Sequence, residues 1–290
     1  MTAKLIYDVG MNNGDDTAYY LHRGFNVLAI EADPTLCSKA SLRFKNEIKE
    51  GRLTILNIGI APVQGELDFW ICDGLSVWNS FHKHIASRDG LPHHSIKIKC
   101  QTFRWVLENY GIPHYLKIDI EGNEYLCIEG LTPSADPPKY VSCELDDMDK
   151  CLHALDALGF SKYKLISQFN FLPWEIPPSK EQRRYEIETQ IATSRNPFAR
   201  VLRKGLRVIG KERWITQMRD RLRRNSGWTF PWGSTGPFGE DLPGQWHSSQ
   251  EVRHIYESFQ NLFRQGVKSS FWDVKKDYSF WVDLHACRED

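Results

Sequence analysis

The sequence contains no long apolar run, no excess of charge of either sign and no paired cysteine motif. No stretch of its 290 residues reaches the roughly 18 apolar residues that a membrane-spanning helix needs. Asp8 and Asp15 stand where the apolar part of a secretory signal would lie, so we expect a protein that is neither membrane-spanning nor exported. The seven cysteines are an odd number without a Cys-x-x-Cys pair, which predicts reduced core residues in a cytoplasmic protein.

Charge is balanced over the whole chain but uneven along it. Lysine and arginine together number 37, as do aspartate and glutamate, which disfavours nucleic acid as a partner. Residues 195–224 nevertheless carry eleven basic and two acidic side chains, among apolar residues at helical spacing. This pattern predicts either a helix with solvated charges or a surface that attracts a phosphate-bearing acceptor or the periphery of an anionic membrane.

Strand-like and helix-like runs alternate through the first 172 residues and predict an α/β fold. The expected strands are residues 4–9, 25–30, 53–60, 115–120, 140–145 and 162–169, and the expected helices are 15–23, 35–49, 102–109, 123–129 and 149–158. Such alternation is typical of βαβ units on a mostly parallel sheet with helices on both faces. Residues 75–83 have no clear period, and we interpret them as a loop near the sheet edge.

The composition changes after residue 172 and predicts three regions. Residues 1–172 form the sheet domain, 173–276 a basic and aromatic-rich cap or insertion, and 277–290 a final strand that returns to the sheet in the antiparallel direction. Within the insertion, residues 227–246 combine aromatic side chains with glycine and proline. These aromatics can stack on sugar rings or form a small core of their own, and the sequence does not separate the two hypotheses.

The segment DVGMNNG, residues 8–14, predicts a turn between the first strand and its helix. A glycine turn at a helix N-terminus lets a ligand approach the backbone, although a tight turn capped by Asn13 explains the pattern equally. The segment is neither a G-x-G-x-x-G motif nor a P-loop. Glu31 ends the second strand about twenty residues later, where a carboxylate can accept ribose hydroxyls. Because Asp8 and Glu31 are both anionic, we expect the cationic cofactor S-adenosylmethionine rather than a pyrophosphate.

A second informative segment is YLKIDIEGNE, residues 115–124. Strand periodicity puts Lys117, Asp119 and Glu121 on one face of a strand that is otherwise apolar. Ligands of open α/β sheets bind at the carboxyl ends of the strands, where Asp119 and Glu121 lie, so these charges predict a binding site. The alternative is an ion pair between Lys117 and Asp119 on a partly solvated edge.

These two segments, together with AIEADP at residues 29–34 and NIGIA at 57–61 followed by GEL at 65–67, resemble the FkbM-type S-adenosylmethionine-dependent methyltransferases. The resemblance covers roughly residues 4–170 and implies a class I, Rossmann-like methyltransferase fold that methylates hydroxyls of sugars, glycans or secondary metabolites. It implies cofactor contacts from Asp8, Gly10, Asn12, Gly14, Thr17, Glu31, Asn57 and Ile58, with Glu31 at the ribose and Asn57 and Ile58 at the adenine. Met11, Asn13 and the long insertion depart from the family pattern.

The resulting functional hypothesis is an O-methyltransferase that acts on a small-molecule or glycan acceptor. Asp119 is the first candidate for the base that removes the hydroxyl proton, and Glu121 and Glu144 are the carboxylates that would share the site. Together they would hold a divalent cation or, equally, accept hydrogen bonds from sugar hydroxyls. The residues predicted to face the acceptor are Asn79, Ser80, His82 and Lys117, with His82 as a second candidate base.

Two other functions fit a sheet of this kind. An NAD-dependent oxidoreductase is disfavoured because the chain has no G-x-G-x-x-G motif and no Tyr-x-x-x-Lys pair. A methyltransferase-like binding module without catalysis would use the basic and aromatic insertion as its working surface. Glu31 argues against that module, since a scaffold has no need of an acid at the ribose position.

Overall fold

The structure is a computed structural model, and contacts divide the chain into two units. It describes residues 3–131, 136–145, 147–168, 171–180, 224–225, 227–231, 233–264 and 281–289, together with residues 183, 197, 201, 204 and 205. Unit 1 comprises residues 1–161 and 286–290, and unit 2 comprises residues 162–285. The domain boundaries expected after residues 172 and 276 stay predictions. The helix expected within residues 195–224 falls largely outside the described residues.

In the described part of the chain, no helix has both the length and the apolar character required to cross a bilayer.

Three parallel strands form the first half of unit 1. They are β1 (Leu5–Val9), β2 (Asn26–Glu31) and β3 (Leu53–Asn57), connected by α1 (Asp15–His22), α2 (Pro34–Arg43) and α3 (Lys45–Lys49). β2 lies between β1 and β3, with Asp8 opposite Ala29 and Glu31 opposite Asn57. The predictions for this region are confirmed, with two differences. The expected long helix is interrupted at Phe44, and the third expected strand ends at Asn57 before the short β4 (Gly59–Ile60).

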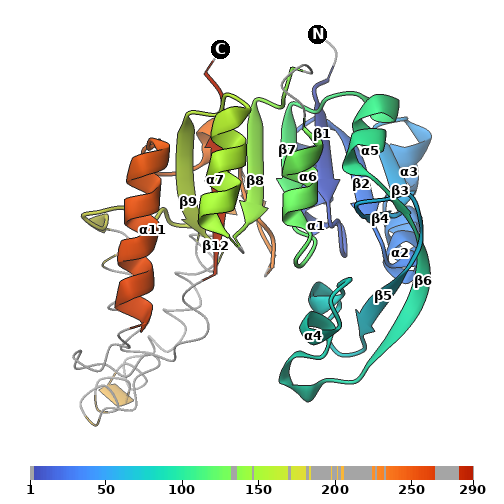
Figure 1. The fold of residues 1–290 in the computed structure, drawn as a ribbon, viewed down its shortest axis with the longest axis horizontal. Helices are drawn as coiled ribbons and strands as arrows, with labels where there is room; N and C mark the ends of the chain where they lie inside the picture. The colour runs from blue at the N-terminus through green and yellow to red at the C-terminus, as the bar shows by residue number, and fades with distance from the viewer. Residues whose placement is uncertain are drawn as a thin grey trace. The chain divides into compact units, whose positions relative to one another are not determined.

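β1 pairs on its other side with β7 (Tyr115–Ile118), and β7 pairs with β8 (Tyr140–Glu144), again in parallel. The helices of this half are α5 (Phe103–Tyr110), α6 (Glu124–Gly130) and α7 (Met148–Ala157). Strand order therefore proceeds in opposite directions from β1. Because βαβ crossovers are right-handed, α1 and α2 cover one face of the sheet and α6 covers the other. Figure 1 shows α6 and α7 in front of β7 and β8.

The full sheet follows the order β3-β2-β1-β7-β8-β12-β9. β9 (Lys162–Ser167) and β12 (Val282–Cys287) are its last two strands. The backbone N–H of Gln168 donates to Trp281 and that of Ser161 donates to Cys287, so β12 runs antiparallel to β9. β12 lies within residues 277–290, the segment for which a returning antiparallel strand was expected. The mostly parallel sheet with one antiparallel insertion is the class I, Rossmann-like architecture.

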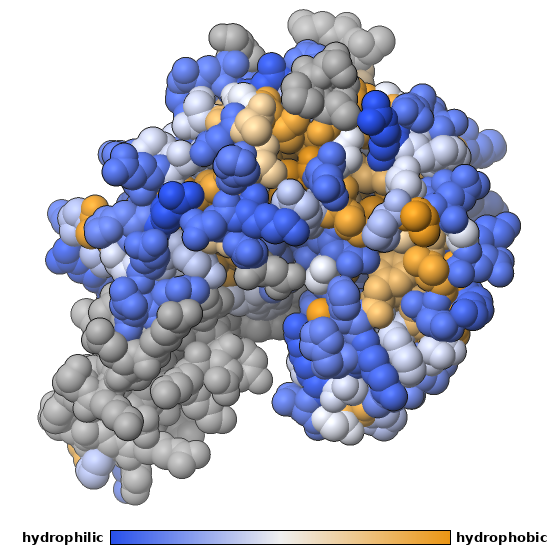
Figure 2. Space-filling model, in the orientation of Figure 1, coloured by the Kyte–Doolittle hydropathy of each residue, from blue (hydrophilic) through white to orange (hydrophobic). Residues whose placement is uncertain are grey.

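A second sheet of three strands, in the order β4-β6-β5, extends from unit 1. β5 (Gly65–Cys72) is antiparallel to β6 (His93–Gln101), a strand that the sequence reading did not predict because its alternating residues are largely polar. Between them, residues 73–92 form what we call the arm. It contains the short helices η1 (Ser76–Trp78), α4 (Lys83–Ala86) and η2 (Arg88–Gly90), where only a loop was expected. Figure 2 shows that the surface over this hairpin and arm is mainly hydrophilic.

Unit 2 has a small aromatic core of its own. Its described elements include β10 (Arg224–Asn225), β11 (Trp228–Thr229), η3 (Gly239–Asp241) and α11 (Ser249–Arg264). Phe230 packs edge-on against Phe171 with 5.4 Å between ring centroids, and Trp174 stacks on Phe259 at 4.6 Å. Phe230 and Phe238 are both buried, so they belong to the core of this unit rather than to a surface for sugar stacking.

Candidate active site

The candidate site lies at the carboxyl ends of β1, β2, β7 and β8, all within unit 1. Strand order reverses between β1 and β7, and open α/β sheets bind ligands at such a reversal. The turn after β1, the last residue of β2 and the segment after β7 meet at this edge of the sheet (Figure 1). The two sequence segments singled out above therefore lie on adjacent strands.

The turn at residues 10–14 has three residues with left-handed backbone, two of which are glycines. Gly10 and Gly14 have φ values of 85° and 80°, and Asn12 between them has 49°. A Cβ atom at Gly10 would lie 1.6 Å from the main-chain oxygen of Asp119, so no side chain fits there. The N–H groups of Gly10 and Met11 both donate to Ile30, which leaves them unavailable to a pyrophosphate.

Glu31 fixes this turn from the end of β2. Its two carboxylate oxygens accept hydrogen bonds from the backbone N–H groups of Asn12 and Asp33, each at 2.8 Å. The side chain is buried, and burial raises the pKa of Glu31 to about 7, although both backbone hydrogen bonds favour the ionised form. Each oxygen of an ionised carboxylate has a second lone pair, so Glu31 can also accept ribose hydroxyls.

Asn57 and Ile58, the predicted adenine neighbours, follow directly at the end of β3. The amide nitrogen of Asn57 donates to the backbone oxygens of Glu31, at 2.9 Å, and Ala32, at 3.0 Å. Asn57 is exposed and Ile58 is half-buried. The structure thus brings both residues to the same edge as Glu31.

Asp8 and Lys117 form a buried ion pair between β1 and β7. The ammonium nitrogen of Lys117 lies 3.0 Å from Asp8 Oδ1 and donates to the backbone oxygen of Gly10 at 2.8 Å. The other oxygen of Asp8 accepts from the hydroxyl of Thr17 at 2.6 Å. Burial alone would lower the pKa of Lys117, but the carboxylates of Asp8, Asp119 and Asp16 raise it, so the ammonium group stays charged.

These contacts give Asp8, Thr17 and Lys117 partners inside the protein. The cofactor contacts predicted for Asp8 and Thr17, and the acceptor contact predicted for Lys117, stay predictions. Because Lys117 neutralises Asp8, Asp8 adds little net charge to the site. The sequence argument that two carboxylates attract a cationic ligand therefore depends mainly on Glu31.

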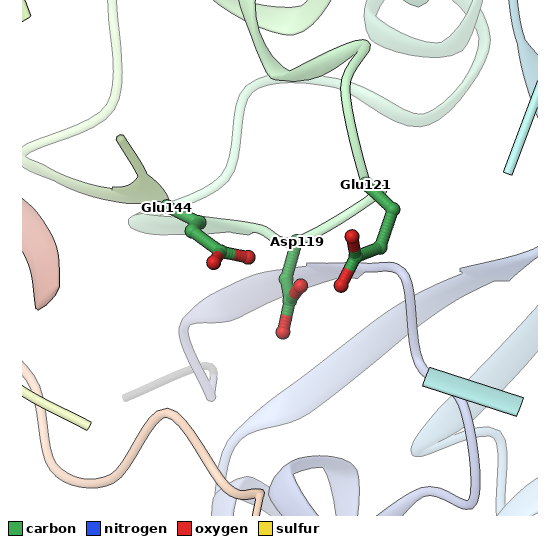
Figure 3. A group of neighbouring side chains, drawn as sticks. All are labelled: Asp119, Glu121 and Glu144. Atoms are coloured by element: carbon green, nitrogen blue, oxygen red, sulfur yellow. The ribbon is translucent and has the colours of Figure 1, made fainter. Parts of the chain in front are cut away.

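Three carboxylates gather at the ends of β7 and β8. Oxygen atoms of Asp119, Glu121 and Glu144 all lie within 4.8 Å of one another, and each side chain is half-buried. Figure 3 shows the three carboxylates pointing toward one another. Lys117 lies 3.7 Å from Asp119, which gives that carboxylate a nearby cation. Such oxygens can hold a divalent cation or accept hydrogen bonds from acceptor hydroxyls, and acidity alone does not distinguish the two.

The arm contributes Asn79, Ser80 and His82, the residues predicted to face the acceptor. Asn79 and Ser80 are buried, and both bond within the protein: Asn79 donates to Asp33 at 3.2 Å, and Ser80 donates to the backbone oxygen of Glu121 at 2.7 Å. The ring of His82 is half-buried and lies 3.3 Å from Asn123 Oδ1. Their acceptor contacts stay predictions, but their hydrogen bonds join the arm to the strand ends.

Three residues of this region were missed by sequence reasoning. Asp33 connects Glu31 to Asn79, Glu124 accepts the N–H groups of Ile120 and Gly122, and Arg88 donates to Glu121 at 3.3 Å. Asp33 and Glu124 are part of the segments quoted above, so the motif was a signal for both. Arg88 lies in an irregular segment and had no such signal.

Comparisons with known proteins identify a family match and low-similarity matches to solved structures. A family model described as the methyltransferase FkbM domain matches residues 8–162. A precorrin-6y C5,15-methyltransferase from Geobacter metallireducens GS-15 is 13% identical over 57% of this chain and 68% of that chain, with a TM-score of 0.30. A SAM-dependent methyltransferase from Geobacter sulfurreducens in complex with S-adenosyl-L-homocysteine is 10% identical over 99% of this chain and 85% of that chain, with a TM-score of 0.32. No curated protein matches the sequence.

The raised pKa of Glu31 predicts a pH-dependent penalty on folding. Between about pH 4.5 and 7 the folded protein keeps a proton on Glu31 that the unfolded chain has lost, so stability falls as pH rises through this window. Over the whole window, the free energy of unfolding of the wild type falls by about 3 kcal/mol. Urea unfolding of wild type and Glu31→Gln at pH 5 and pH 8 tests this. From pH 5 to pH 8, the free energy of unfolding of the variant should rise relative to that of the wild type by about that amount.

Glu129→Gln, at an exposed position of α6, is the control for this change and should respond equally at both pH values. An unchanged difference between wild type and Glu31→Gln at pH 5 and pH 8 would show that Glu31 titrates normally.

The Asp8–Lys117 pair predicts a large loss of stability when one partner is removed. Lys117→Met leaves Asp8 buried without its cation, which should lower the free energy of unfolding by about 3–5 kcal/mol. The double variant Asp8→Asn/Lys117→Met leaves no unpaired charge and should recover part of that loss. Arg104→Gln, which breaks an exposed pair with Glu108 on α5, should cost less than about 1 kcal/mol. Equal urea midpoints for Lys117→Met and Arg104→Gln would contradict this assignment.

Proposed function

The chain belongs to the FkbM methyltransferase family, and we propose that it methylates a hydroxyl group of a sugar, nucleotide sugar, glycan or related secondary metabolite. The enzyme is an S-adenosylmethionine-dependent methyltransferase. When bound, this cofactor supplies an electrophilic methyl group on a positively charged sulfur. The acceptor class and the O-methylation chemistry are the parts that we propose.

The residues at the strand ends fit this cofactor. Glu31 has lone pairs available for two ribose hydroxyls, and the main chain at Gly10 comes close to the neighbouring strand without a side chain in the way. We propose that the turn residues Gly10, Asn12 and Gly14 contact the methionine part and that Asn57 and Ile58 border the adenine. Asp8 accepts a hydrogen bond from Thr17 and pairs with Lys117, which in turn donates to the Gly10 carbonyl of the turn.

The observation that carries the proposal is the contact of Asp119 with the end of β1 and the turn that follows it, residues 10–14, which we propose holds the cofactor. The backbone N–H of Asp119 donates to the backbone oxygen of Val9 at 2.9 Å, and the Asp119 carbonyl occupies the space beside Gly10. A carboxylate is thereby fixed to the same edge as the turn that would hold the methyl donor. This is the arrangement that methyl transfer to a hydroxyl requires, because acceptor, base and donor must meet.

In the proposed reaction, an acceptor hydroxyl oxygen attacks the methyl carbon in line with the bond that breaks. The new oxygen–carbon bond forms as the sulfur takes the electron pair of the old one, and the hydroxyl proton passes to a carboxylate. Asp119 is our first candidate for that base, which would contribute about 10² to 10⁴-fold to the rate. Glu121 and Glu144 would accept hydrogen bonds from other hydroxyls of the acceptor and so orient it.

We also propose that the protein works in the cytoplasm. All seven cysteines are buried and none forms a disulfide, which supports a reducing compartment, since secreted proteins commonly form disulfides.

Ligand binding and methyl transfer test this function directly. Isothermal titration should give micromolar affinity for S-adenosylmethionine and S-adenosylhomocysteine and no binding of NAD. Incubation with S-adenosylmethionine and a set of nucleotide sugars and glycans, with and without Mg²⁺, should yield S-adenosylhomocysteine and an acceptor heavier by one methylene group. A folded sample that binds neither sulfur compound would refute the proposal.

Replacing the candidate base separates chemistry from cofactor binding. Asp119→Asn should lower kcat by about 10² to 10⁴-fold, because the amide cannot take the proton. The dissociation constant for S-adenosylhomocysteine should stay within a few-fold. Asp68→Asn is the control, because Asp68 also pairs with a lysine but lies at an exposed position of β5. It should leave kcat and the dissociation constant unchanged. Unchanged turnover in Asp119→Asn would eliminate Asp119 as the base.

A further inference from the structure

The arm, residues 73–92, reaches from the β5–β6 hairpin to the carboxyl ends of the main strands (Figure 1). Its residues bond to both sides of the candidate site. On the cofactor side, Ser76 contacts Asn12 at 3.0 Å and Asn79 donates to Asp33. On the carboxylate side, Ser80 and Arg88 both contact Glu121.

Glu121 is held by the arm at two of its atoms. Ser80, fully buried, donates its hydroxyl to the backbone oxygen of Glu121 at 2.7 Å. Arg88 Nη1 donates to Glu121 Oε2 at 3.3 Å; the Arg88 side chain is 45% exposed and that of Glu121 is 17% exposed. The first contact joins the arm to the main chain at Glu121, and the second joins it to the Glu121 carboxylate.

Glu121 lies in a tight turn that Glu124 stabilises. Glu121 has a φ of 54°, an uncommon value for a residue with a side chain, and Gly122 follows it at 107°. Glu124 stabilises this turn by accepting the N–H groups of Ile120 and Gly122, so it contacts the main chain on either side of Glu121. These contacts hold the main chain, whereas Arg88 contacts the Glu121 carboxylate itself.

A cation beside the three carboxylates lowers the repulsion between them. Asp119, Glu121 and Glu144 approach one another within 4.8 Å, and like charges at that separation repel. Lys117 offsets part of this repulsion beside Asp119 at 3.7 Å. Arg88 contacts the cluster at Glu121 and thus offers a second positive charge.

We propose that Arg88 is a positioning residue that holds the Glu121 carboxylate in the acceptor cluster. Its catalytic consequence rests on the proposed function, but its effect on the place of Glu121 does not. Arg88 acts here through Glu121 rather than through direct contact with the acceptor.

Crystal structures of wild type, Arg88→Gln and Arg88→Lys, each without ligand and with S-adenosylhomocysteine, test the positional claim. In Arg88→Gln the Glu121 oxygens should move beyond 4.8 Å from those of Asp119 and Glu144. In Arg88→Lys they should stay, because the cation is retained. Arg104→Gln breaks an exposed ion pair of the same 3.3 Å length and should leave Glu121 in place. An unmoved Glu121 in Arg88→Gln would overturn the proposal.

A double-mutant cycle with Glu121→Gln tests the consequence for catalysis, using the acceptor that the methyl-transfer assay identifies. Arg88→Gln should lower kcat by up to about fivefold, as expected for a half-exposed ion pair, without changing cofactor affinity, and Arg88→Lys should recover most of that loss. In the Glu121→Gln background, Arg88→Gln should have no further effect. If it instead raises KM equally in both backgrounds, Arg88 contacts the acceptor and the proposal is wrong.

The two proposals fail in different ways. If wild type transfers no methyl group to any acceptor, the proposed function fails, and the position of Glu121 in the crystal structures still decides the role of Arg88. If wild type is active and Glu121 does not move in Arg88→Gln, only the role of Arg88 fails.

Discussion

The buried ion pair between Asp8 and Lys117 joins the two strands at which the sheet reverses its order. The ammonium group of Lys117 also donates to the Gly10 carbonyl in the turn after β1, and it lies near Asp119 after β7. Two buried charges cost desolvation free energy, which only good geometry and extra hydrogen bonds offset. Thr17 and the Gly10 carbonyl supply those bonds, so the ion pair connects the turn after β1 to β7.

For Lys117 the nearby carboxylates outweigh the effect of burial on the pKa, whereas for Glu31 burial outweighs the hydrogen bonds that favour the ionised form. Burial raises its pKa to about 7, even though two backbone N–H groups bond to its oxygens. The protein therefore maintains a buried carboxylate at this position at some cost in stability. A residue chosen for stability alone would be apolar at this depth, and its retention as an acid agrees with a role in binding ribose.

Regular alternation allowed the sheet to be predicted, because buried parallel strands and amphipathic helices leave strong periodic signals. The strands β1 to β4, β7 to β9 and β12 correspond to predicted runs. The failures have two physical origins, which are local polarity and the shortness of some elements. β6 alternates largely polar residues because one of its faces is solvated, and the short helices of the arm are too brief to show a period.

The candidate site was predictable where its residues follow strands, and unpredictable where they come from the arm. Asp119, Glu121 and Glu144 meet because the carboxyl ends of parallel strands share one edge, which sequence order already implies. Arg88 meets Glu121 across 33 residues of chain, and Ser80 does so across 41, through tertiary contacts that no local pattern records. The residues proposed to bind the cofactor therefore lie in motifs that the sequence reveals. The contacts that Ser80 and Arg88 make with Glu121 depend instead on how an irregular arm folds back onto the strand ends.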